Sequence, residues 1–239
     1  MDMQPISFVL LWHMHQPDYR NYETGEFMLP WVYLHDVIDY TDMVAHLEAH
    51  PSMKAVVNFV PVLLDQLEDY AAQFAQAQIR DPLLRLLARP DLEQVSASDR
   101  LRVFDSCFRS NHVTMMQPYP AYKRLHDMHE TLRGRGEAEL AYLSGQYLAD
   151  LLVWYHLAWT GESVRRSNET VVRLMTQGGG FSHADRVQLL NLIGDLIQGL
   201  IPRYRKLAES GQIELSTTPH YHPIAPLLID FASARDSMP

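Results

Sequence analysis

Two short apolar runs constrain the fold of this chain more than any other feature. Residues 6–12 (ISFVLLW) and 55–60 (AVVNFV) are continuous and rich in branched and aromatic side chains, and runs of this length are typical of strands. A strand without polar alternation is usually covered on both faces, which is the situation in parallel sheets. We therefore expect a parallel α/β sheet, with strands over these two ranges.

Helical patterns surround these runs. Apolar residues recur at helical spacing over 40–47, where Pro51 ends the pattern, and again over 63–74 after Pro61, which suits the first turn of a helix. Helical periodicities then follow one another over about 81–207 without a strand-like run, and 212–216 (QIELS) has the pattern of a third strand. The sequence predicts a β-α-β-α unit and a large helical insertion, about 81–207, between the second and third strands.

Composition and charge exclude several classes of protein. The chain has 239 residues, of which 47% are hydrophobic and 21% charged, as in ordinary folded domains. Its formal net charge of -9 and its lack of a Lys/Arg cluster argue against nucleic-acid binding. The longest apolar stretches, 6–12 and 148–159, are too short or too interrupted to cross a membrane. Cys107 is the only cysteine, so no intrachain disulfide can form, and we expect a cytoplasmic protein.

Polar side chains follow or interrupt two of the predicted strands. His13 and His15 come directly after the first strand, and because side chains alternate along an extended chain, both rings should lie on the same side. Ligands bind at the carboxyl ends of strands in parallel α/β proteins. Glu214 lies between the apolar Ile213 and Leu215, so we expect a buried carboxylate that needs hydrogen-bond partners at the same edge.

Two chemistries are consistent with these residues. A His-x-His pair can bind a divalent metal. Alternatively, the imidazoles, Gln16 and Glu214 can hydrogen-bond the hydroxyl groups of a sugar, whose apolar face would stack on an aromatic ring. Candidates for the stacking are Tyr19, Tyr22, Tyr33 and, above all, Trp31.

Four motifs carry a resemblance to a known family. They are HMHQP (13–17), LPWVYLHDVIDYTDMVAHLE (29–48), NFVPVLLDQL (58–67) and GQIELSTTPHYHPIAPLL (211–228). Together they resemble the N-terminal part of glycoside hydrolase family 57, whose members are retaining enzymes acting on α-glucans and related sugars. The resemblance implies an α/β fold that is part of a seven-stranded (β/α) barrel, with residues 1–239 forming the N-terminal part of one catalytic domain.

The resemblance also implies roles for particular residues. His13 and His15 resemble the two family histidines that contact the sugar to be cleaved, and Glu214 resembles the acidic sugar contact. The expected substrate-binding set is His13, His15, Gln16, Trp31, Glu214, Tyr221 and His222. The family nucleophile, a glutamate, and the acid/base, an aspartate, come from later strands, so we expect no catalytic residue, metal or cofactor in these 239 residues. His222 stands where several members have glutamate, which leaves the exact substrate class open.

The expected partner is therefore an α-glucan or oligosaccharide, and the expected whole enzyme is of the α-amylase or 4-α-glucanotransferase type. Two other classes stay open. A metal-dependent carbohydrate deacetylase would use His13 and His15 as metal ligands, and a non-catalytic module would bind sugar without cleaving it. We also expect the 239 residues by themselves to be inactive, because three parallel strands cannot close a barrel.

Overall fold

A computed structural model describes residues 6, 8–132 and 141–237, and its centre is one parallel sheet. The strands are β1 (Leu11–Met14), β2 (Ala55–Phe59) and β3 (Ile213–Thr217), in the order β1-β2-β3. Both strand pairs are parallel. The predicted α/β class with parallel strands is therefore confirmed, and β2 lies between two strands that are far apart in the sequence.

The first strand begins later than predicted. Its pairing with β2 places Leu11 opposite Val56, and the hydrogen bond from Val56 N–H to the Leu10 carbonyl oxygen, 2.8 Å long, comes just before it. Phe8 and Val9 are largely exposed and precede the strand. The prediction of a strand over 6–12 was wrong because a strand needs a partner, and β2 starts only at Ala55. As a consequence, His13 lies inside β1 and not after it.

The remaining elements are helical. The first group consists of α1 (Trp31–His35), a π-helical turn η1 (Asp36–Tyr40), α2 (Thr41–Ala49) and α3 (Pro61–Ala75). Between α3 and β3 lie α4 (Pro82–Ala88), α5 (Ala97–Ser106), η2 (His112–Met116), α6 (Pro120–Leu132), α8 (Gly145–Ala158), α9 (Glu162–Ser167), α10 (Glu169–Gln177) and α11 (His183–Glu209). After β3 come α12 (Ala225–Ile229), η3 (Phe231–Ser233) and α13 (Ala234–Ser237).

The longest helix connects the helical region with the sheet. α11 begins at a capping box, in which Ser182 and Asp185 exchange hydrogen bonds, and it contacts α2, α3, α4 and β3. Near its start, the buried guanidinium of Arg186 donates hydrogen bonds to carbonyl oxygens at the end of α4, among them Leu87 at 3.0 Å and Pro90 at 3.0 Å. The two terminal nitrogens of this buried cation are satisfied by backbone carbonyl groups, so the side chain fixes α11 against α4.

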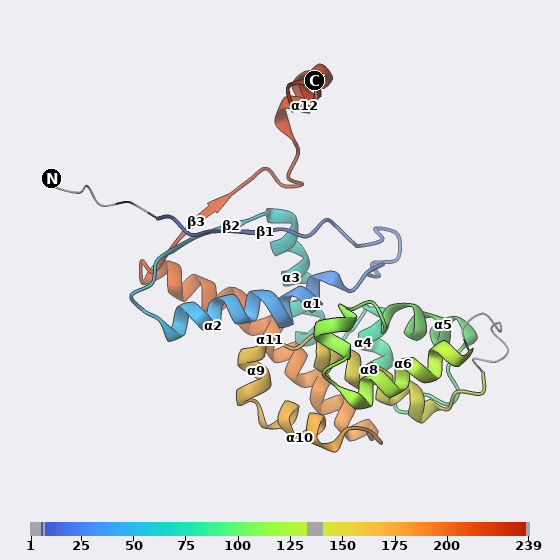
Figure 1. The fold of residues 1–239 in the computed structure, drawn as a ribbon. Coiled ribbons are helices and arrows are strands. Elements are labelled where there is room, and N and C mark those ends of the chain that lie inside the picture. The colour runs from blue at the N-terminus through green and yellow to red at the C-terminus, as the bar shows by residue number, and fades with distance from the viewer. Residues whose placement is uncertain (1–5, 7, 133–140, 238–239) are drawn as a thin grey trace.

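Within the described residues, helices cover only one face of the sheet. Figure 1 shows α2 and α11 on one side of the strands, while the opposite side is open. Met14 and Val57 point toward the helices and are fully buried, whereas Leu11 and His13 point the other way and are exposed. The expectation that the strands are covered on both faces is therefore not met by this part of the chain.

One of the predicted sugar-stacking residues belongs to the core. Tyr33 is fully buried in α1, and its hydroxyl lies 2.9 Å from Nε2 of the buried His156 in α8. The rings of these two residues are also stacked. Tyr33 therefore cannot offer a face to a ligand, and the prediction for it was wrong.

Cys107 is also completely buried, as expected of a small core residue.

Candidate functional site

Three histidine rings meet on the open face at the carboxyl end of the sheet. The ring centroids of His13, in β1, and His15, directly after it, lie 5.9 Å apart. His222, from the loop after β3, lies 4.8 Å from His13 and 5.0 Å from His15, stacked on the latter. The prediction that His13 and His15 lie on the same side is confirmed. His222, which was also in the predicted substrate-binding set, is 207 positions beyond His15 and completes the same cluster.

The backbone of His222 is in an unusual conformation. Its φ angle is +52°, a left-handed value that side chains with a Cβ adopt at a cost. The N–H of His222 donates to the Pro219 carbonyl oxygen at 2.9 Å, so a tight turn holds this conformation. The turn directs the imidazole back onto His15, and the stacking with that ring offsets part of the cost.

Burial and the neighbouring rings favour a neutral imidazole at His15. The pKa of His15 is lowered, first by burial and then by the positive charge that His222 and His13 would carry. A neutral imidazole has one N–H donor and one bare acceptor nitrogen. Such rings can both donate to and accept from hydroxyl groups, which is the pattern that recognition of a sugar requires.

A polar row crosses all three strands beside this cluster. His13, Asn58 and Ser216 are opposite one another in the strand register, so they share one face. Nδ1 of His13 lies 2.7 Å from Oδ1 of Asn58, and the Asn58 amide nitrogen donates to the Ser216 hydroxyl at 2.9 Å. Neither Asn58 nor Ser216 was among the residues predicted for the site. The signal for Asn58 was a single polar residue within the apolar run AVVNFV.

The loop after His15 is held from behind by α3. The side chain of Gln66, fully buried in that helix, accepts a hydrogen bond from Tyr19 N–H at 3.0 Å and donates one to the Pro17 carbonyl oxygen at 2.9 Å. The Tyr19 hydroxyl in turn donates to Oε1 of Gln16 at 2.9 Å. The conformation of the loop that carries Gln16 therefore depends on a buried amide in α3.

A second contact connects this loop with the segment that carries His222. The Tyr22 hydroxyl donates to the Asp18 carboxylate at 2.5 Å and lies 3.3 Å from the hydroxyl of Tyr221. Asp18 also accepts hydrogen bonds from Arg20. Although burial opposes the charged form, the hydrogen bonds from Arg20 and Tyr22 lower the pKa of Asp18 to about 2. A permanently charged carboxylate thus anchors Tyr22, and through it Tyr221, at the rim of the cluster.

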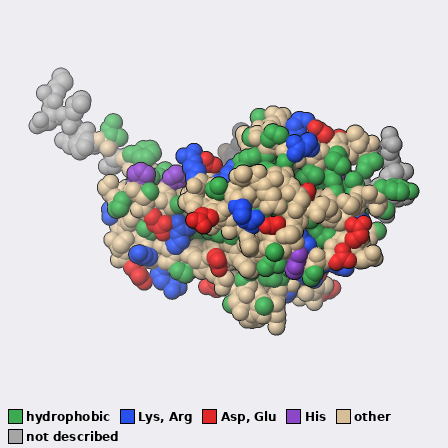
Figure 2. Space-filling view, turned by 90° about the horizontal axis from the view of Figure 1, so that it is seen from below, with side chains coloured by type: hydrophobic (Ala, Val, Ile, Leu, Met, Phe, Trp, Pro, Cys, Tyr) green, Lys and Arg blue, Asp and Glu red, His purple; other side chains and the backbone are tan. Residues whose placement is uncertain are grey.

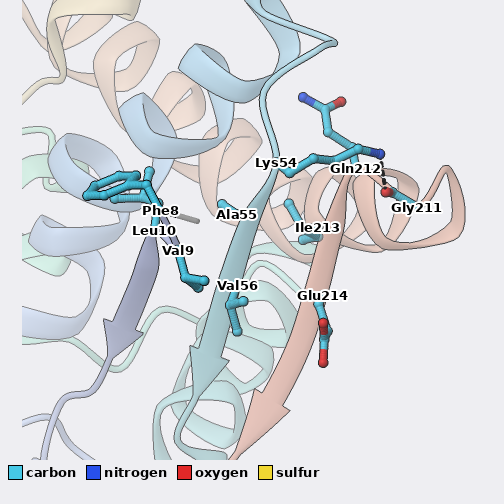
Figure 3. Close-up of a pocket in the computed structure, with 10 residues that line it drawn as sticks. All are labelled: Phe8, Val9, Leu10, Lys54, Ala55, Val56, Gly211, Gln212, Ile213 and Glu214. Carbon is cyan, nitrogen blue, oxygen red and sulfur yellow. Dashed lines mark hydrogen bonds between the residues drawn. The ribbon is translucent and has the colours of Figure 1, made fainter. Parts of the chain in front are cut away.

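Glu214 does not join the histidine cluster. It is the second residue of β3 and lies opposite Val56, two residues nearer the amino end of the sheet than the row of His13. Figure 3 shows Glu214 and Val56 pointing the same way beside a hollow of about 340 Å³ that Phe8 and Lys54 also line. Its side chain is exposed. The expectation of a buried carboxylate at the strand's carboxyl end was therefore wrong, because the face that Glu214 occupies is open.

Trp31 belongs to a separate aromatic group. It is the first residue of α1, and its ring centroid lies 5.6 Å from that of Trp159, at the end of α8, and 6.4 Å from that of His35. His35 lies 2.5 Å from the carboxylate of Asp39, measured from Nδ1. Trp31 is partly buried against the core. The group joins the sheet region to the helical region.

Charges of both signs are mixed on one face of the molecule. Figure 2 shows basic and acidic side chains interspersed over the face in view, without one large patch of a single sign. Among the described residues, no three or more His, Cys, Asp or Glu side chains are grouped so that they could hold a metal ion. No helix in the same part of the chain has both the length and the apolar character needed to cross a bilayer.

A parallel sheet with imidazole, amide and phenol groups near its carboxyl end defines an α/β protein with a polar, open candidate site. Comparison with protein families identifies the class more closely, because the model of glycosyl hydrolase family 57 matches residues 9–237, nearly the whole chain. The chain therefore belongs to glycosyl hydrolase family 57. This membership makes glycoside hydrolysis or transglycosylation the class of activity and a carbohydrate the class of substrate. No curated protein and no solved structure matches the chain in the corresponding comparisons.

Proposed function

We propose that residues 1–239 form the N-terminal part of a retaining glycoside hydrolase or transglycosylase of the α-amylase or 4-α-glucanotransferase type and that they bind an α-glucan. The observation that carries this proposal is the cluster of His13, His15 and His222, which presents imidazole nitrogens on an open face. Gln16 and Tyr221 are the sequence neighbours of His15 and His222. Gln16 contacts Tyr19, and Tyr221 contacts Tyr22. Trp31 and Glu214 would contact sugar units farther along a chain, because neither lies within the cluster.

The proposal includes a seven-stranded barrel. Two features of the described residues support it. β3 is an edge strand, and edge strands with free backbone groups invite another strand to pair. Beside it, the half-exposed Leu215 lines an apolar hollow of about 390 Å³ together with Phe59, Leu64 and Tyr204, as expected where a further helix and strand would pack.

A retaining mechanism needs two carboxyl groups about 5 to 5.5 Å apart, one as nucleophile and one as acid/base. We assign neither role to Glu214, since it lies apart from the histidines and faces solvent. In the proposed enzyme, Glu214 is a sugar contact only.

The single cysteine, which is buried, supports our placement of the protein in the cytoplasm.

Calorimetric titration with maltoheptaose and cellohexaose tests the proposal. We expect the 239-residue chain to bind maltoheptaose, and His13→Ala and His222→Ala to weaken this binding by about tenfold each, since each ring supplies one or two hydrogen bonds. The matched control is His183→Ala, on the exposed side of α11, which should bind normally. Equal affinity for cellohexaose, or unchanged binding after both site substitutions, would refute an α-glucan site.

Activity assays test whether these 239 residues lack catalytic activity. The 239-residue chain should release no reducing sugar from soluble starch and transfer no glucosyl units between maltooligosaccharides. Turnover that disappears in Glu214→Gln would show that Glu214 is catalytic and not a sugar contact only.

The metal-dependent deacetylase has no support among the described residues. Stoichiometric zinc that survives dialysis and is lost in His13→Ala would revive it.

A further inference from the structure

The amide of Asn58 has a defined orientation in the polar row, with its nitrogen toward Ser216 and its oxygen toward His13. It is 8% exposed and lies between His13 on one side and Ser216 on the other. A carboxamide has an oxygen that only accepts and a nitrogen that only donates hydrogen bonds. Because its nitrogen donates to the Ser216 hydroxyl, its oxygen faces the ring of His13.

The orientation of the Asn58 amide determines which ring nitrogen of neutral His13 carries the hydrogen. An oxygen that only accepts, 2.7 Å from Nδ1, requires that Nδ1 carry a hydrogen. In a neutral imidazole the other nitrogen, Nε2, then has a free lone pair. A second residue behind a ligand-binding histidine often selects its tautomer in this way.

We propose that Asn58 is a positioning residue that keeps neutral His13 in the Nδ1–H tautomer, so that Nε2 of His13 accepts a hydrogen bond from a sugar hydroxyl. The part of this inference that concerns the sugar rests on the proposed function, but the part that concerns the tautomer does not. Ser216 contributes by orienting the Asn58 amide. The tautomer of His13, in β1, therefore depends on a residue of β3, two strands away.

Nitrogen NMR of the ring measures the tautomer directly. Two-bond ¹H–¹⁵N correlation spectra of the ¹⁵N-histidine-labelled chain, recorded above the pKa of the rings, separate protonated from bare ring nitrogens, and His13→Gln assigns the His13 signals. We expect a protonated Nδ1 and a bare Nε2 in the unmodified protein. Asn58→Ala should shift His13 toward the Nε2–H form. Asn58→Asp should keep Nδ1–H, because a carboxylate still accepts from it.

Two further variants make the test specific. Ser216→Ala should lower the share of the Nδ1–H tautomer, since the Asn58 amide then loses the acceptor that orients it. Gln212→Ala is the matched control: Gln212 is also an amide at 8% exposure beside the same sheet, but its nitrogen donates to the Leu47 carbonyl oxygen. This variant should leave the His13 spectrum unchanged.

Each outcome decides the inference. An Nε2–H ring in the unmodified protein, or a His13 spectrum that does not change in Asn58→Ala, overturns it. If Asn58→Ala does not fold, the unmodified protein and Asn58→Asp still decide, because both must show Nδ1–H. With maltoheptaose as the probe, Asn58→Ala should bind about fivefold more weakly and Asn58→Asp close to normally. Absence of maltoheptaose binding by the unmodified protein defeats the proposed function, while the nitrogen shifts still test the tautomer.

Discussion

The backbone N–H of Tyr19 donates a hydrogen bond of 3.0 Å to the side-chain oxygen of Gln66, which is fully buried in α3. The same side chain donates to the carbonyl oxygens of Pro17 at 2.9 Å and Val62 at 3.0 Å. One amide therefore supplies both the donor and the acceptor that the loop carrying Gln16 needs, and the loop has its shape only while the amide is present.

We expect Gln66→Leu to lower the free energy of unfolding by about 2–4 kcal/mol, since buried backbone groups of the loop lose their partners. Gln66→Glu should cost less, because the acceptor for Tyr19 N–H remains. Urea denaturation measures both. The control is Gln198→Leu, on the exposed side of α11, which should change stability little. A Gln66→Leu protein as stable as this control would show that the loop does not depend on Gln66.

The pKa of His15 should depend on its two histidine neighbours. Burial, His222 and His13 lower the pKa of His15, in that order. Replacing His222 by alanine removes a neighbouring positive charge and part of the cover over His15, so the pKa of His15 should rise. NMR titration of the ring protons measures it. His220→Ala serves as the control, because the His220 ring lies 3.3 Å from the Asp65 carboxylate and outside the cluster. A His15 pKa that moves equally in both variants would argue against the cluster.

Asp36 should make the protein less stable as the pH rises. Neither of its buried carboxyl oxygens has a hydrogen-bond partner among the described residues, and burial raises its pKa from 3.8 to about 8 against the opposing influence of Arg203. Between these two values the folded chain keeps a proton that the unfolded chain releases. Stability therefore falls from about pH 4 to pH 8 and then levels off.

Asp36→Asn should remove this slope and stabilise the protein at pH 8 by on the order of a few kcal/mol. Thermal denaturation at several pH values measures the difference. Asp195→Asn, at an exposed position of α11, should retain the slope of the unmodified protein. A slope that persists unchanged in Asp36→Asn would assign it to other groups.

Two glycines should respond to alanine in opposite directions. A Cβ on Gly161 would lie 2.5 Å from Oδ1 of Asp42 and 2.9 Å from the Ile38 carbonyl oxygen. Asp42 accepts hydrogen bonds from the first N–H groups of α9, so Gly161→Ala should cost about 2 kcal/mol by displacing this cap. Gly199 is in α11 with free space where a Cβ would lie, so Gly199→Ala should stabilise by about 0.5–1 kcal/mol. Differential scanning calorimetry of the two variants should show Tm changes of opposite sign.

The sequence by itself was sufficient for the α/β class, the order of the elements and the placement of His13 and His15 on one side of the chain. Each of these features depends on the backbone geometry of a few consecutive residues. The direction of side chains repeats along a helix or a strand with a period that neighbouring residues set. The motifs of the family were also readable in the sequence, and they led to the family that the comparison then confirmed.

Only the tertiary structure decided the limits of β1, the exposure of Glu214, the burial of Tyr33, and the meeting of His222 and Asn58 with His13. The start of β1 depends on where β2 begins, and the exposure of Glu214 depends on which face of the sheet the helices cover. His222 reaches the cluster only because β3 pairs with β2 after a separation of more than 150 positions. Strand partners and layers are chosen by long-range hydrogen bonding and burial, which no local period of the sequence records.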